Sequence, residues 1–211
     1  MRYNFKNILT GFFVLIVLVS LVRFWPFGGE VIYGPGVFAP DEPIQHNISN
    51  APMFMHNDYF ITPLATFEAS ARVLSRRNYS WGRESDLSPV DFALGWGRMS
   101  DEAVYSQINI RQNHRFYYWR VREFPIPRRE IETSSANMHM VPANREIERA
   151  LKRVRSGDLI HFKGHLIRAE SADGWRWVSS LTRTDTGNGA CEIVFVEEFE
   201  ILRPGGSSTA L

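Results

Sequence analysis

The sequence predicts an α+β chain that is mainly β, with an N-terminal transmembrane helix followed by a small, partly open β-barrel and short helices. Three observations lead to this fold class. Residues 8–22 form an apolar stretch without charge, residues 143–155 have the apolar spacing of an amphipathic helix, and several β-prone segments follow Gly157. A β-sandwich is the alternative arrangement of the same strands.

The apolar stretch continues to residue 27 and predicts a membrane anchor over residues 8–27. A bilayer core of about 30 Å needs about 20 helical residues, which this segment supplies. Arg23 lies near its end, where a long side chain can reach the headgroups, and Pro26 ends the helix. A cleaved signal peptide is the alternative, but large residues occupy the place of a small-x-small cleavage site.

Basic residues predict the orientation of the anchor. Arg2 and Lys6 precede the apolar core, and only Arg23 follows it closely. By the positive-inside rule the N-terminus is cytoplasmic and the C-terminal domain lies outside, which in a bacterium is the periplasm. We therefore expect a single-pass protein of the bacterial inner membrane.

Composition divides the chain into four parts: an anchor over 1–29, an extended spacer containing proline and glycine over 30–58, a β-rich extracytoplasmic domain over 59–203, and a flexible tail over 204–211. The anchor has three basic residues and no acid, out of 24 basic and 23 acidic residues in total, so the remainder is slightly negative. Nucleic acid is therefore not an expected partner. The expected partners are the bilayer, through residues 8–27, and a protein in the membrane or periplasm. The single cysteine excludes a disulfide-built domain.

The predicted elements follow from periodicity and from capping residues. Before Gly157 they are a strand over 59–79, a helix opening at Ser88-Pro89, a second helix opening at residues 100–102, a strand over 114–124, a short helix over 128–135, and the helix over 143–155. The alanines within 59–79 also permit a helix there. After Gly157 the expected strands are 158–163, 165–169, 175–181 and 192–202, with Gly164 as a turn. Strands of this number around one helix are OB-like in outline, which is an architectural analogy that implies no chemistry.

Two methionine and histidine clusters are candidate soft-metal ligands. They are Met53, Met55 and His56 in one segment, and Met138, His139 and Met140 in another. Thioether and imidazole groups suit Cu(I), so a copper-handling protein is one hypothesis. The alternative is that the methionines fill gaps in a core, and no cofactor is the primary expectation. His161 and His165 are four residues apart but lack a third zinc ligand.

His139 and Cys191 are the candidate catalytic residues, as a base and a nucleophile that would meet in space. Asp91 or Asp185 could serve with His139 instead. The alternative for Cys191 is a small buried side chain at the start of a strand. No G-x-S-x-G nucleophile motif is present.

Trp175, Arg176 and Trp177 are a candidate binding surface, since residues two apart place both indoles on one face of a strand. Such a face can stack a base, a sugar or a partner, or it can belong to the core.

Three functions remain open from the sequence. The first is a membrane-tethered extracytoplasmic binding or assembly module, which the anchor, the spacer and the lack of a catalytic motif favour. The second is a membrane-bound hydrolase that uses His139 with Cys191 or an acid, and the third is a periplasmic copper-handling protein.

Overall fold

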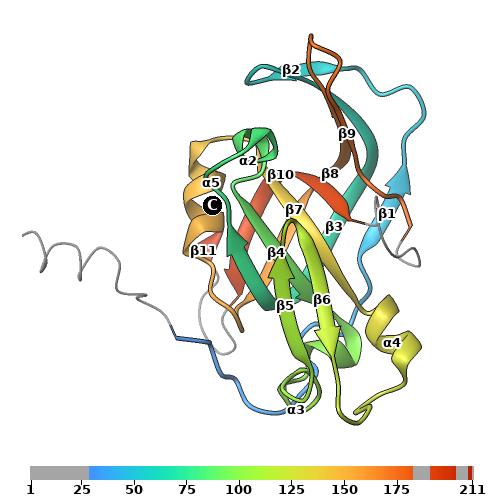
Figure 1. Cartoon of the computed structure of the whole chain (residues 1–211), viewed down its shortest axis with the longest axis vertical. Coiled ribbons are helices and arrows are strands. Elements are labelled where there is room, and N and C mark those ends of the chain that lie inside the picture. Colours follow the sequence, from blue (N-terminus) through green and yellow to red (C-terminus); the bar gives the residue numbers. More distant parts are fainter. Residues whose placement is uncertain (1–28, 183–190, 203–208, 211) are drawn as a thin grey trace, which may run out of the picture.

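The computed structural model describes residues 29–182, 191–202 and 209–210 (Figure 1). The predicted anchor over residues 8–27 lies outside these ranges. Among the helices that are described, none is both long and apolar enough to cross a membrane. The described chain is mostly β, and its large sheet is partly closed.

Eleven strands and five short helices make up the described part of the chain. The strands are β1 (Ile44–Asn47), β2 (Phe54–His56), β3 (Tyr59–Asn78), β4 (Val90–Gly95), β5 (Asn109–Asn113), β6 (Phe116–Arg120), β7 (Ser135–Pro142), β8 (Leu159–Glu170), β9 (Arg176–Val178), β10 (Glu192–Leu202) and β11 (Thr209–Ala210). The helices are α2 (Arg83–Leu87), the 3-10 helix η1 (Gly97–Ser100), α3 (Glu102–Tyr105), α4 (Arg128–Thr133) and α5 (Arg145–Arg153).

The large sheet returns on itself because β3 pairs with both β4 and β8. From β4 the pairing continues antiparallel to β7, parallel to β10 and antiparallel to β8. β1 and β2 pair with β3, β9 pairs with β8, and α5 packs against β7 and β10. β5 and β6 form a separate two-stranded hairpin, which lies in front of β4 and β7 in Figure 1.

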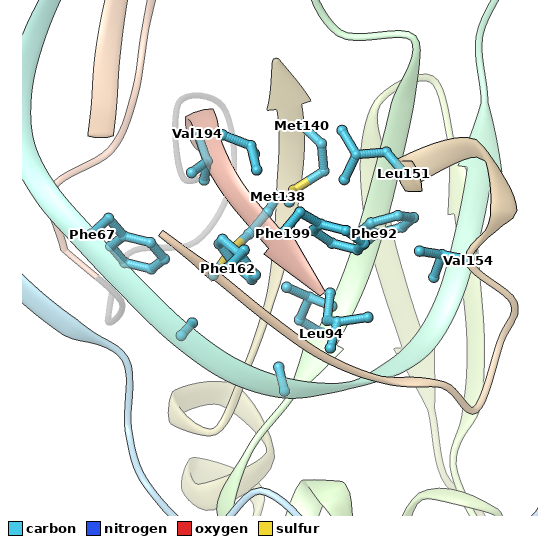
Figure 2. Packing of buried hydrophobic residues seen from close by; sticks show 14 of the residues in the cluster. Phe67, Phe92, Leu94, Met138, Met140, Leu151, Val154, Phe162, Val194 and Phe199 are labelled. Carbon is cyan, nitrogen blue, oxygen red and sulfur yellow. The ribbon is translucent and has the colours of Figure 1, made fainter. Parts of the chain in front are cut away.

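The main core lies inside this partly closed sheet (Figure 2). In β3 it takes Phe67, Ala69, Ala71 and Val73, the alternate residues that the period of two predicted. β4, β7, β8 and β10 likewise contribute the apolar side chains of one face, and α5 contributes one apolar face. The labelled members in Figure 2 are Phe67, Phe92, Leu94, Met138, Met140, Leu151, Val154, Phe162, Val194 and Phe199.

The predicted turn at Gly164 is wrong, because β8 runs without a break through this residue. A Cβ atom at Gly164 would lie 1.8 Å from the carbonyl oxygen of Phe195 on β10. The register of β8 against β10 also shifts close by, between Val196 and Glu198. The glycine therefore permits a close approach of two strands at a bulge. His161 and His165 consequently lie on one continuous strand.

The predicted helix at Ser88-Pro89 is also wrong, because these residues lead directly into β4. All six residues of β4 are buried. A strand that is covered on both faces does not alternate between apolar and polar residues, so the period of two was missing here. The helix predicted at residues 100–102 is confirmed: it is α3, with Asp101 as its N-cap. The helix over 143–155 is confirmed as α5, capped by Asn144.

The first part of the predicted spacer packs against the body of the protein. Val31 donates a backbone hydrogen bond to Ser156, and Ala39 accepts one from Gly97. Between them, Gly34 and Gly36 donate to the carboxylates of Glu102 and Asp101. We call residues 31–39 the strap. The division of the chain into domains stays a prediction.

Candidate functional site

The outer face of β4, β7 and β10 carries an unusual number of buried polar groups. Because Phe92, Met138 and Val194 point into the core, their neighbours in sequence point outward. The strand register places Asp91 opposite His139. Asn137, two residues before His139, lies on the same face. The sheet thus brings together side chains from distant parts of the sequence.

The turn of the β5–β6 hairpin covers this face. His114 and Arg115 take left-handed backbone conformations there, with φ of 49° and 68°. The side chain of Arg115 points toward the sheet, and its Nη1 donates a hydrogen bond of 2.7 Å to Oδ1 of Asp91, a fully buried carboxylate. The guanidinium group also lies 3.8 Å from the ring centroid of Tyr79, the residue that follows β3. This cation–π contact and the ion pair anchor the turn of the hairpin to the sheet.

Further hydrogen bonds tie the hairpin to β7. Gln112 Nε2 donates to Asn137 Oδ1 at 2.8 Å, and Asn137 Nδ2 donates to the carbonyl oxygen of Arg115 at 3.0 Å. The hydroxyl groups of Tyr117 and Ser135 lie 3.0 Å apart. Burial raises the pKa of Tyr117 to about 12, while the hydrogen bond with Ser135 opposes this shift. The polar face therefore holds the hairpin in one position.

His139 lies at the centre of this face and is 3% exposed. Its Nδ1 is 3.0 Å from Oδ2 of Asp91, and the alignment of the two groups does not fit a hydrogen bond. The Trp177 ring covers the imidazole with a centroid distance of 4.8 Å. The structure therefore joins His139 to Asp91, one of the two acids considered with it; Asp185 lies outside the described residues.

Cys191 lies on the same face, just before β10, and is partly buried. Its Sγ is 3.7 Å from Nδ2 of Asn137 and 3.8 Å from the carbonyl oxygen of Arg115. Ile193 is the register partner of His139, so Cys191 lies diagonally from the imidazole. Strand geometry gives a Cα separation of about 8 Å for such a diagonal pair. The thiol contacts the hairpin turn, whereas the imidazole contacts Asp91 and Trp177.

Trp175 and Trp177 point toward the protein. They pack against a second apolar cluster, formed by the outer faces of β7, β8 and β10 and by the start of β3. Trp175 lies 5.4 Å from the ring of Tyr59, and the exposed Arg176 lies 3.8 Å from Glu170. The structure gives the two indoles packing contacts, and ligand binding at them stays a prediction.

The candidate copper ligands do not share a site. Met138 and Met140 are fully buried inside the sheet, on the face opposite His139. Met53 and Met55 are each 56% exposed in and beside β2. His56 contacts Phe195 edge to face, and burial lowers the pKa of its imidazole.

Within the described ranges, no group of three His, Cys, Asp or Glu residues could hold a metal ion. His161 bonds to Ser70, and His165 lies 3.0 Å from Glu197.

The solvent-facing side of the hairpin was not identified from the sequence. Arg111 and Tyr118 are register partners on this side, and Arg120 lies next to them on β6. A groove of about 960 Å³ runs along the open end of the hairpin, where Arg122 also lines it. Among the described residues, none of these three arginines forms an ion pair with an acidic residue, in contrast to Arg115. The available signal was the run of four aromatic residues over 116–119 followed by Arg120 and Arg122, which predicted only a strand.

No family model, curated protein or solved structure matches this chain at a significant level. Its function is therefore inferred from its own residues and their arrangement.

Proposed function

We propose that the chain is a membrane-tethered extracytoplasmic binding or assembly module of the bacterial inner membrane. In this proposal residues 8–27 anchor it in the bilayer, and the solvent-facing side of the β5–β6 hairpin contacts a partner. One observation carries the proposal: Arg111, Arg120 and Arg122 lie together without acidic partners among the described residues, beside the exposed Tyr118. Arginine and tyrosine are the residue types that are enriched at interfaces and at their energetic centres.

The buried polar face supports this proposal because it makes the hairpin rigid. A two-stranded hairpin alone is only marginally stable in water. Here the contacts of Arg115 with Asp91, and of Gln112 with Asn137, fix its position against β4 and β7. A preorganised surface loses less conformational entropy on binding than a mobile one. Buried polar groups are expensive without partners, so their concentration under the hairpin suits a role in positioning it.

The proposed architecture is an OB-like barrel. Its five strands would be β3, β4, β7, β8 and β10, with α5 between β7 and β8. OB-like barrels bind ligands on the face of the second and third strands, which correspond to β4 and β7. In this chain the hairpin is inserted between those two strands and covers that face. By analogy only, we propose that the outer side of the hairpin has taken over the binding role.

Site-specific photocrosslinking in native membranes tests the proposal. A photoreactive phenylalanine analogue replaces Tyr118 in the full-length chain, and the control replaces Arg149, an exposed residue of α5. We expect discrete adducts from position 118 that weaken when Arg120 and Arg122 are changed to glutamine. The same adducts from position 149, or none from either position, would count against a binding surface on the hairpin.

A thiol hydrolase is the second candidate, favoured by the contact of His139 with Asp91 on the face that holds Cys191. A small rotation of the neutral imidazole would let its Nδ1 donate to Asp91, which would then orient the ring, and its Nε2 would take the proton of the Cys191 thiol. The sulfur would bond to an acyl carbon, the leaving group would depart with that proton, and water would then release the acid and restore the thiol. The hairpin turn contacts the sulfur, so it would first have to move aside.

Alkylation of the full-length protein by iodoacetamide at neutral pH separates the two candidates. Rapid labelling of Cys191 that slows at least tenfold in His139→Gln would favour the hydrolase. Slow labelling that does not depend on His139 would favour the binding module.

A further inference from the structure

The hairpin also indicates the chemistry of its partner, an inference that rests on the proposed binding role of this surface. We infer that the groove at the open end of the hairpin binds an acidic peptide segment in extended conformation.

The positive charges of the site lie within reach of one ligand. Arg111 is opposite Tyr118 across the hairpin, and Arg120 is opposite Asn109, so both guanidinium groups project on the solvent side. Arg122 follows β6 and lines the same groove. Guanidinium groups bind carboxylates with two parallel hydrogen bonds, which gives both charge complementarity and geometry. A ligand with several carboxylates therefore matches this surface.

The shape and the mixed lining of the groove favour a peptide over other anions. Ile110, Trp119 and Val121 also line the groove. They pack against a core cluster, with Ile110 and Trp119 on the inward side of the hairpin, and the part of their apolar surface that stays exposed can contact peptide side chains. A concave site does not fit the plane of a bilayer. Glu123 also lines the groove and forms no ion pair with another described residue. A carboxylate here would repel a uniformly charged polyanion, whereas a peptide can place a backbone or side-chain N–H beside it.

The backbone of the hairpin offers a second means of recognition. β5 and β6 pair only with each other among the described strands. An extended peptide can add to the edge of such a ribbon through main-chain hydrogen bonds, while alternate side chains enter the groove.

Fluorescence anisotropy of the full-length protein in detergent micelles tests the inference. The probe is a fluorescein-labelled decapeptide of alternating glutamate and valine, and its lysine counterpart is the control. We expect saturable binding of the acidic peptide alone. Each exposed ion pair contributes about a 1.4- to fivefold change in affinity, so R111Q/R120Q/R122Q, which removes three of them, should weaken binding by about 3- to 125-fold. The variant R145Q/R149Q/R153Q makes the same change of net charge on α5 and should leave affinity within about twofold.

Two competitors decide between ligand classes. If polyphosphate or the short-chain lipid dihexanoylphosphatidylglycerol binds with the same dependence on the hairpin arginines, and the peptide does not, the inference is overturned in favour of a polyanion or a membrane surface. Equal loss of peptide binding in the α5 variant would also overturn it, because it would show a response to net charge alone. If no probe binds, the acidic peptide is excluded, whereas adducts from Tyr118 in native membranes still decide the proposed function separately.

Discussion

The ion pair of Asp91 and Arg115 should hold the hairpin in place, and its removal should release the hairpin from the sheet. Asp91 is fully buried, and the Arg115 side chain is 17% exposed. Changing Asp91 to alanine leaves this guanidinium group without its carboxylate and removes the charge beside His139.

The expected loss of stability follows from burial. Removing one partner of a buried ion pair costs about 3–5 kcal/mol. Because water reaches part of Arg115, we expect the lower end, about 3 kcal/mol, for Asp91→Ala. The variant Arg115→Met keeps apolar contact with Tyr79, and the double variant should show a coupling energy of about 2 kcal/mol between the two positions. In urea the unfolding midpoint of Asp91→Ala should fall by about 1–2 M.

Hydrogen exchange locates the effect. Amide groups of β5 and β6 should exchange roughly 150-fold faster in Asp91→Ala, which corresponds to about 3 kcal/mol. Amide groups of β8 should accelerate with the loss of global stability, but only the exchange of the hairpin should be nearly independent of low urea concentrations, because the hairpin opens without unfolding the rest of the chain. A double-mutant cycle with a coupling below about 0.5 kcal/mol would refute the reasoning. So would unchanged exchange in the hairpin, because it would show that other contacts hold it.

Three further outcomes are expected. Gly164→Ala should destabilise the protein by about 3 kcal/mol in chemical denaturation, because the added Cβ meets the carbonyl of Phe195, whereas Gly29→Ala should stay within about 0.5 kcal/mol. The raised pKa of Tyr117 adds stability that is complete below its ordinary value of 10 and is lost as pH rises toward 12. Tyr117→Phe should flatten the pH dependence of unfolding in that window, and an unchanged slope would show that its phenol is not protected. Alkaline phosphatase fused to the C-terminus should be active in a bacterial host and a fluorescent-protein fusion dark; the reverse would place the domain in the cytoplasm.

β3 was predictable from a period of two, because its apolar and polar residues alternate over 66–73. β10 was predicted from its run of β-prone residues, although Ile193 to Val196 are all apolar and buried, so that part of the strand is covered on both faces. β4 is buried throughout, and Ser88-Pro89 before it has the form of a helix start. β7 was missed because Met138 and Met140 were considered as metal ligands. Residues on the core-facing side of a strand have the same spacing of two, and both methionines lie on that side of β7.

The candidate site depends on strand register, which the sequence does not reveal. His139, Cys191 and Asp91 were all considered beforehand, but only the pairing of β4, β7 and β10 places them on one face. Arg115 was missed because its role comes from a hairpin turn made by His114 and Arg115, without the glycine or asparagine that normally marks such turns. β5 has no apolar alternation either, so the hairpin had no local signal on that side.

The strap would connect an anchor over residues 8–27 to the domain, and Arg72 is the residue that should hold the strap in place. The guanidinium group is fully buried and donates to the carbonyl oxygen of Val31 at 3.1 Å and to the Tyr105 hydroxyl at 2.8 Å, with the Tyr33 ring centroid 4.7 Å away. Its Nε and Nη1 have no hydrogen-bond partner among the described residues, which reduces its net contribution to global stability. A local measurement is therefore more informative than a denaturation curve.

The rate of cleavage by chymotrypsin is such a measurement. Tyr33 lies in the strap, and cleavage of the chain after Tyr33 would separate the domain from an anchor over residues 8–27. In the strap itself, Arg72 contributes one hydrogen bond from a charged group, to Val31, and a cation–π contact with Tyr33, which together correspond to about 3 kcal/mol of local stability. Arg72→Ala should therefore release the domain from proteoliposomes roughly 100-fold faster, since cleavage follows the population of the open strap. Arg145→Ala, at an exposed position of α5, should not change the rate. Release within about threefold of the unaltered protein would mean that Arg72 does not hold the strap, and that the hydrogen bonds of Gly34 and Gly36 with α3 and its N-cap suffice.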